Sequence, residues 1–91
     1  MDTKQINLML RKLDDWQHVN GVIQKSFQFN DYQTNMFFIN AISWVSHKHN
    51  HHPEITVGYN FCTIKYSTHE IGGLSERDFN CALKVDSLFN I

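Results

Sequence analysis

The segment His47–Pro53 constrains the fold more than any other, because it holds four of the six histidines and ends on the only proline. A proline lacks a backbone N–H and biases the residue before it toward extended geometry, so a helix cannot continue through this point. The chain must therefore turn here, between a helix that we predict before the segment and a strand that we predict after it. We expect this bend to be rigid where the histidines lie.

A long helix is predicted from Asn30 to about His49. Asn30 and Gln33 have the spacing of a capping box, with an amide in place of the usual hydroxyl. The apolar residues that follow form a wide face suited to packing flat on a sheet, namely Phe37, Phe38, Ala41, Ile42, Trp44 and Val45. We expect Trp44 and the phenylalanines to be core residues. The helix would carry the histidine segment at its C-terminal end.

Four strand-like runs, arranged as two hairpins, occupy residues 15–19, 22–29, 54–59 and 62–67. The first two runs are separated by Asn20-Gly21, which is the strongest short hairpin signal because both central residues of a type I′ turn need a positive φ. The apolar residues of the second run share one face, on which Lys25 is the exception. The last two runs alternate in the same way and predict a second hairpin.

Shorter helical patterns open and close the chain. Thr3 can cap a first helix that we expect to stop near residue 14. Ser75 and Asp78 form a capping box before a last helix that runs to about Phe89. The order α-β-β-α-β-β-α, in a single domain of residues 1–91, predicts a two-layer α+β fold. Its four-stranded antiparallel sheet would have the helices on one face.

The composition argues against several classes of function. Eight Lys and Arg residues against nine Asp and Glu residues give a net charge of −1, and the basic residues are too scattered for direct nucleic-acid binding. No signal peptide and no membrane-spanning apolar run is recognisable. Cys62 and Cys81 are too few for a secreted disulfide scaffold. We therefore expect a soluble cytoplasmic protein with two free thiols and no membrane partner.

The histidines are candidate proton-transfer residues. Imidazole alone has an unperturbed pKa near pH 7, about 6.5, so it can give and take a proton in one turnover. His69 is followed by Gly72-Gly73 and can be held in a tight turn that faces the segment described above. This gives a candidate site of His51, His52 and His69. Such a set suits a dehydration next to a nitrogen, which needs one proton delivered to a leaving oxygen and another removed nearby.

Two other interpretations of the histidines remain open. His47 and His51 are four residues apart, which on a helix would place both imidazoles on one face, as in a zinc site. However, no acidic general base follows them, and Lys48 adds a cation to the cluster. The other interpretation is a polar helix end, which we favour for His18, His47 and His49.

Several motifs are spaced along the chain, namely Phe27-Gln28-Phe29, His51-His52-Pro53-Glu54, Tyr59-Asn60, Ser67-Thr68-His69-Glu70, Gly72-Gly73-Leu74-Ser75 and Asp78. Together they resemble the motifs of the pterin-4a-carbinolamine dehydratase family. The gaps between them are similar to those in the family, and the resemblance covers most of the chain. It implies a metal-free acid/base dehydratase that converts 4a-hydroxytetrahydrobiopterin to quinonoid dihydropterin. Such an enzyme recycles the pterin cofactor of aromatic amino-acid hydroxylases.

The resemblance also implies roles for individual residues. The family's acid/base candidates match His51 and His69, and the histidine that matches His52 helps to hold the pterin, so these three form the expected catalytic set. The implied pterin-binding residues are His51, His52, Pro53, Thr68, His69, Glu70 and Ile71. No cofactor or metal is implied, because the pterin is the substrate. Members of the family commonly assemble as homodimers or homotetramers.

The chain departs from the family pattern at His47, Ile55 and Glu70, and the resemblance also implies one alternative function. His47 stands where the family usually has an acid, so we expect a carboxylate that could orient an imidazole to be missing there. We interpret Asp78 mainly as a helix-capping residue. Animal relatives also act as a dimerisation partner of a transcription factor, and a protein-binding module with this fold is therefore the alternative function.

Overall fold

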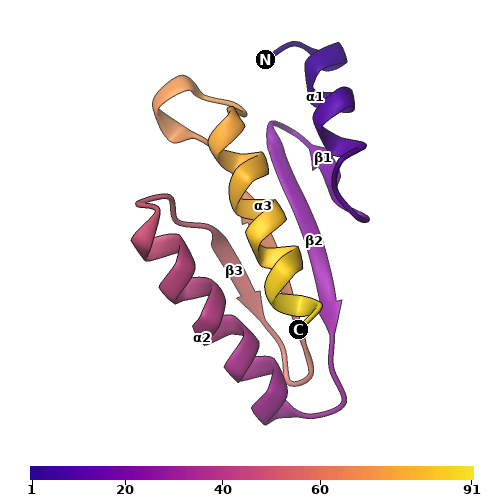
Figure 1. Ribbon diagram of the computed structural model, residues 1–91, viewed down its shortest axis with the longest axis vertical. Helices are drawn as coiled ribbons and strands as arrows, with labels where there is room; N and C mark the ends of the chain where they lie inside the picture. Colours follow the sequence, from indigo (N-terminus) through magenta and orange to yellow (C-terminus); the bar gives the residue numbers. More distant parts are fainter.

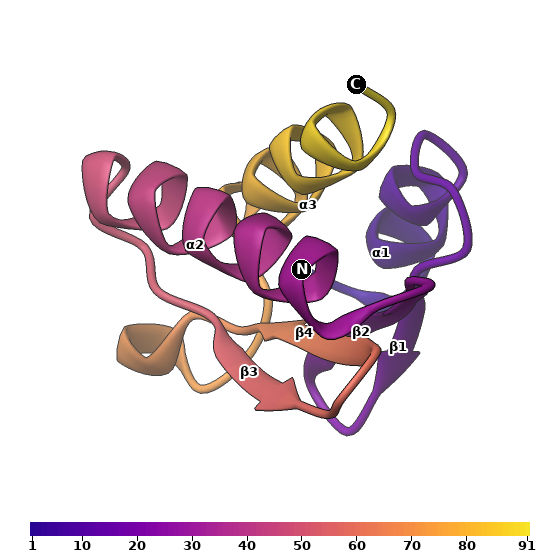
Figure 2. The same ribbon diagram turned by 90° about the horizontal axis from the view of Figure 1, so that it is seen from below.

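A computed structural model describes all of residues 1–91 as two layers, a sheet and the helices that cover it (Figure 1). The elements are α1 (Thr3–Leu10), β1 (Gln17–Val19), β2 (Val22–Gln28), α2 (Tyr32–Lys48), β3 (Glu54–Val57), β4 (Phe61–Tyr66), the short 3₁₀ helix η1 (His69–Ile71) and α3 (Glu76–Phe89). Figure 2 shows the three α-helices on one face of the sheet. The predicted α+β class and the predicted order of elements are confirmed.

The sheet consists of two hairpins that pair with each other at its centre. Asn20 and Gly21 join β1 to β2 with φ angles of 51° and 77°, as the predicted type I′ turn requires. The strand order is β1-β2-β4-β3, and all neighbours are antiparallel. β1 and β3 are therefore the edge strands, and β3 is the strand that begins directly after Pro53.

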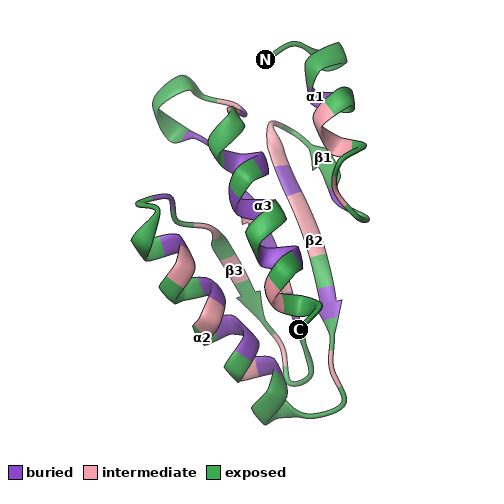
Figure 3. Ribbon diagram, in the orientation of Figure 1, coloured by how far each residue is buried: buried purple, intermediate pink, exposed green.

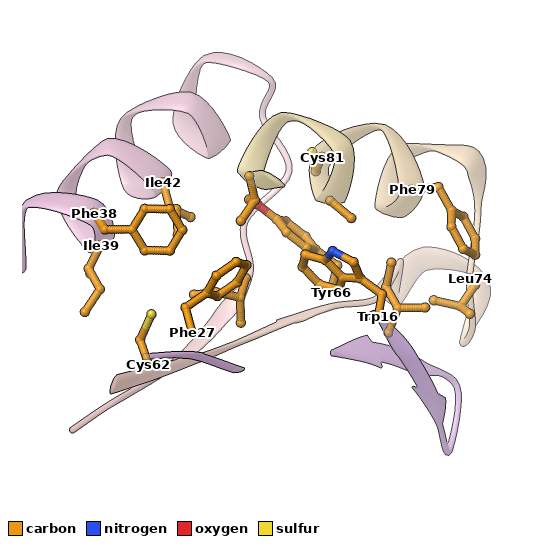
Figure 4. Packing of buried hydrophobic residues seen from close by; sticks show 14 of the residues in the cluster. Trp16, Phe27, Phe38, Ile39, Ile42, Cys62, Tyr66, Leu74, Phe79 and Cys81 are labelled. Carbon is orange, nitrogen blue, oxygen red and sulfur yellow. The ribbon is translucent and has the colours of Figure 1, made fainter. Parts of the chain in front are cut away.

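α2 buries a narrower face than we predicted. Phe38, Ile39 and Ile42 are buried between the helix and the sheet (Figure 4). Phe37 and Trp44 each have 63% of their surface exposed, so the prediction that they belong to the core is wrong. Successive residues of a helix are turned by about 100°, and residues beside the buried stripe therefore point into solvent. Figure 3 shows how buried and exposed positions alternate along α2 as a result.

Two helices begin one residue away from the predicted cap. Asp2, not Thr3, is the N-cap of α1, and Asp31, not Asn30, is the N-cap of α2. In each case the carboxylate accepts a hydrogen bond from the backbone N–H three residues further on. Asp, Asn and Thr are all good caps, so residue type alone cannot decide which of two neighbours takes the position. α1 also ends at Leu10, earlier than expected.

Lys25, the exception on the apolar face of β2, forms an ion pair with α3. Its Nζ lies 2.9 Å from Oδ1 of Asp86. The same carboxylate accepts hydrogen bonds from Nε1 of the buried Trp16 at 3.1 Å. A cation can be buried when a carboxylate meets it, and the lysine side chain is only 9% exposed. This network ties the segment before β1 to both β2 and α3.

The two cysteines are buried and unpaired. Cys62 lies on β4 and Cys81 on α3, and neither forms a disulfide. This agrees with the expectation of free thiols. None of the helices has both the length and the apolar content needed to cross a membrane.

Candidate functional site

A histidine–aspartate pair forms the centre of the candidate site. His51 follows the end of α2, where its backbone N–H donates to the carbonyl of Ser46 at 3.1 Å, and only 7% of its surface is exposed. Its Nε2 lies 2.6 Å from Oδ1 of Asp78, which is fully buried in the first turn of α3. The bend at Pro53 and the start of α3 thus bring together two residues that are 27 positions apart.

Asp78 has a structural role and a site role at the same time. Its Oδ2 accepts hydrogen bonds from Oγ1 of Thr68 at 2.8 Å and from the backbone N–H of Ser75 at 2.9 Å, which completes the predicted capping box. A carboxylate that accepts on both oxygens leaves Nε2 of His51 as the donor. The lone pair of this imidazole is then on Nδ1, which is free to accept a proton. The interpretation of Asp78 as mainly a capping residue was therefore incomplete.

A carboxylate reaches His51 from another part of the chain, although position 47 holds a histidine and not an acid. No hydrogen bond joins His47 to His51, and the ring of His47 lies 5.9 Å from the ring of His52. The carboxylate that orients the His51 imidazole comes instead from Asp78, through a contact between distant parts of the chain. Asp78 belongs to the spaced motifs, nine residues after His69, but its spacing to His51 is not a local pattern and gave no signal of this bond.

Tyr66 supports the other side of the imidazole. Its ring is stacked on that of His51, with centroids 5.7 Å apart and planes inclined by 13°. The hydroxyl is hydrogen-bonded to Oγ of Ser46 on α2 at 2.7 Å. Burial raises the pKa of Tyr66 to about 12 against the opposing effect of the Ser46 hydrogen bond, so the phenol remains neutral at physiological pH. We did not predict this residue as part of the site, although the alternation along β4 indicated that it would be buried.

The other predicted histidines lie on exposed turns beside this pair. His52 directly follows His51, and His69 opens the short helix η1, which ends at Gly72 with φ of 65°. Both histidines are exposed, and no hydrogen bond joins either of them to His51. Thr68 closes the η1 turn through reciprocal backbone hydrogen bonds with Gly73. The structure therefore brings Thr68 to the His51–Asp78 pair and leaves His52 and His69 facing solvent.

The remaining predicted binding residues also lie on these two turns. Pro53 is half-buried between His52 and β3. Glu70 and Ile71 are exposed in η1, where Glu70 forms an ion pair with Arg77 of α3. Solvent can thus reach the edge of the site that these turns form, whereas Asp78 is buried beneath that edge.

The arrangement does not match the zinc site considered above. α2 ends at Lys48, and Asn50 has a φ of 51°, so His51 does not share a helix face with His47. No group of three His, Cys, Asp or Glu side chains lies close enough together to hold a metal ion.

The fold and the site together define a small α+β protein with a buried imidazole–carboxylate pair of the kind that transfers protons. The sequence model of the family described as "Pterin 4 alpha carbinolamine dehydratase" matches residues 1–88. The chain belongs to this family.

Individual relatives agree with this assignment. The chain is 50% identical to a "Putative pterin-4-alpha-carbinolamine dehydratase" of Nitrosospira multiformis over 91 residues, which are 100% of this chain and 80% of the relative. It is 47% identical to a protein of the same name from Nitrosomonas europaea, over 98% of this chain and 80% of the relative.

Two solved structures share the fold. A "transcriptional coactivator/pterin dehydratase" from Brucella melitensis superposes with a TM-score of 0.93 at 32% identity, over 97% of this chain and 96% of that one. A pterin dehydratase-like protein identified as a RuBisCO assembly factor in the alpha-carboxysome has a TM-score of 0.68 at 23% identity, over 84% and 88% of the two chains. The second likeness concerns the fold alone.

Proposed function

We propose that this protein is a 4a-hydroxytetrahydrobiopterin dehydratase, which forms quinonoid dihydropterin and so recycles the pterin cofactor of aromatic amino-acid hydroxylases. The observation that carries the proposal is the hydrogen bond between Nε2 of His51 and Oδ1 of Asp78. It prepares Nδ1 of a single buried imidazole to accept a proton, which is what the reaction needs next to the pterin nitrogen. Family membership supports the same substrate class.

The dehydration is a balanced pair of proton transfers. The bond between C4a and the hydroxyl oxygen breaks, the oxygen gains a proton and leaves as water, and N5 loses a proton as a double bond forms between C4a and N5. His51 takes the N5 proton on Nδ1, and Asp78 stabilises the imidazolium that results. His52 and His69, which are exposed, are the candidates that protonate the leaving hydroxyl.

We assign the pterin ring to the edge of the site between the two turns. Backbone groups around Pro53 and across Thr68, His69, Glu70 and Ile71 would line the ring, and His51 and His52 would meet the reacting atoms. Because no electron is gained or lost and both protons can move through imidazoles, we propose that no cofactor or metal is required. The buried free thiols support a reducing compartment such as the cytoplasm.

The proposal is tested by stopped-flow decay of freshly generated 4a-hydroxytetrahydrobiopterin, followed by ultraviolet absorbance in a chelator-treated buffer. We expect wild type to accelerate the decay, and His51→Gln and His69→Gln to lose about 100-fold of that acceleration. The exposed His18 on β1 offers the matched control, because His18→Gln removes an imidazole from an edge strand that contributes no residue to the candidate site. Wild-type rates in both site variants, in protein with unchanged thermal melting, would overturn the proposal.

A protein-binding function is the second candidate. It is favoured by the exposed aromatic side chains of Phe37 and Trp44 on α2 and by the coactivator name of the Brucella melitensis structure. This function would be supported if the wild-type protein lacked dehydratase activity but bound a specific helical partner in a pull-down, and if Trp44→Glu lost that binding.

A further inference from the structure

We propose that a hollow beside His51 binds a phosphate group carried on the C6 side chain of the pterin. This inference rests on the proposed function and deepens it, because it names phosphorylated pterins as the preferred substrate class. The hollow has a volume of about 120 Å³ and lies where the end of α2 meets α3. Its wall is formed by His49, His51, Arg77, Asn80, Cys81 and Lys84.

No carboxylate lines the hollow, and every side chain of its wall except the Cys81 thiol is cationic or carries an N–H group. Arg77 and Lys84 are permanently charged at neutral pH, although the whole chain has a net charge of −1. Arg77 is partly balanced by its ion pair with Glu70, whereas Lys84 has no ion-pair partner. Asp78 is fully buried and is engaged by His51, Thr68 and Ser75, so it does not line the hollow. An anion placed here would therefore meet the charge of Lys84, which no carboxylate pairs.

Cys81, on the wall of the hollow, lies near charges of both signs. Burial is the main cause that raises the pKa of the Cys81 thiol, and Asp78 raises it further. Lys84 and Arg77 act in the opposite direction, because they favour the anionic thiolate. An anion at this wall is therefore favoured by Lys84 and Arg77 and opposed by Asp78.

The hollow is large enough for a phosphate group. Its volume of about 120 Å³ is several times the roughly 10–15 Å³ that a cavity needs in order to hold one water. Arg and Lys are the side chains that bind phosphate most strongly, through charge-assisted hydrogen bonds.

The chemistry of the substrate places its side chain next to this hollow. In a pterin, C6 is bonded to N5, which is bonded to C4a. If Nδ1 of His51 takes the proton from N5, a chain on C6 begins beside the imidazole. His51 also lines the hollow, so a hydroxylated chain of three carbons can carry a terminal phosphate toward Lys84.

The test compares two ligands that differ only in the phosphate, dihydroneopterin and its monophosphate, in calorimetric titrations under anaerobic, phosphate-free, low-salt conditions. We expect wild type to bind the monophosphate about fivefold more tightly, as one partly exposed charge pair would predict. Lys84→Met should abolish the difference and Lys84→Arg should retain it. Lys4→Met, which removes the same charge from α1, should leave the preference unchanged. The preference should also shrink in high salt.

A separate titration with inorganic phosphate distinguishes a tethered group from a free anion. If inorganic phosphate binds wild type and not Lys84→Met, while the two pterins bind equally, the site takes free phosphate and the substrate assignment is overturned. Equal binding of the two pterins without phosphate binding overturns the site itself. Dehydration of the unphosphorylated substrate is measured on the same preparations. Its absence would count against the proposed function, whereas its presence without a phosphate preference would count against this inference alone.

Discussion

Contacts on two sides hold the ring of His51 and leave one nitrogen free. Asp78 fixes Nε2 at 2.6 Å, and Tyr66 covers one face of the ring. Both partners are almost fully buried, so their positions are set by packing in the core. The candidate base is therefore held in one orientation, while His52 and His69 remain exposed on turns.

Replacing the carboxylate should separate its site role from its capping role. In Asp78→Asn, the amide can still accept from the backbone N–H of Ser75, but its NH₂ group no longer stabilises an imidazolium. We expect the dehydration rate constant to fall by about 100-fold or more, with a loss of stability of about 1 kcal/mol, the cost of a weakened cap. Stopped-flow rates and urea unfolding measure the two effects. Equal activity of variant and wild type would remove Asp78 from the mechanism.

The buried acidic groups on β4 predict a loss of stability in alkali. Burial raises the pKa of Cys62 from 9.0 to about 11 and that of Tyr66 from 10.0 to about 12. In the unfolded chain these groups ionise first, so the stability they contribute is full below pH 9 and is lost as pH rises toward 12. We expect the free energy of unfolding to fall over this range, and to fall less steeply in Cys62→Val. Parallel curves for the variant and wild type would contradict this.

At the scale of elements, one ion pair joins the two halves of the domain. Lys25 on β2 and Asp86 on α3 are 61 positions apart and meet at 2.9 Å, with Trp16 bonded to the same carboxylate. Each side chain of the pair is about one-tenth exposed, so removing one partner leaves a nearly buried charge.

We expect Asp86→Ala to lower the free energy of unfolding by about 3 kcal/mol, measured by urea denaturation. A double variant, Lys25→Met with Asp86→Leu, should recover much of this loss because no charge is left unpaired. Asp14 gives the matched control, since its carboxylate is 4.0 Å from the same Nζ but 91% exposed. Asp14→Ala should change stability by less than about 1 kcal/mol. If the Asp14 and Asp86 variants lost similar amounts of unfolding free energy, burial of the Lys25–Asp86 pair would not explain its contribution to stability.

At the scale of the whole molecule, one face is left uncovered. Phe37 and Trp44 project from α2 with 63% of each residue exposed, and the edge strand β3 pairs with β4 on one side and has its other edge free. Exposed aromatic patches and free strand edges are common sites of association. Both features support the proposal that the protein forms homodimers or homotetramers.

The assembly is tested by sedimentation of wild type and of the double variant Phe37→Glu with Trp44→Glu. We expect wild type to be a dimer or tetramer and the variant to be smaller by at least a factor of two, because buried glutamates would be unpaired in the interface. Leu8→Glu on α1, where the apolar side chain is 50% exposed, controls for added charge. A wild-type monomer would rule out the assembly, and an unchanged mass in the variant would exclude this face of α2.

The elements that depend on neighbouring residues could be predicted from the sequence. The Asn20-Gly21 turn, the capping box from Ser75 to Asp78 and the end of the helix before Pro53 all follow from local backbone geometry. Hydrophobic periodicity predicted the order of helices and strands for the same reason. The spaced histidine motifs, which the sequence alone carries, pointed to the family.

Only the tertiary structure decided which of these residues meet. The bond of His51 to Asp78, the stacking on Tyr66 and the pairing of Lys25 with Asp86 join segments that are far apart in the chain. The exposure of Trp44 likewise depends on how α2 sits on the sheet. Local propensities set the elements, whereas close packing of their side chains in one core sets the contacts between them.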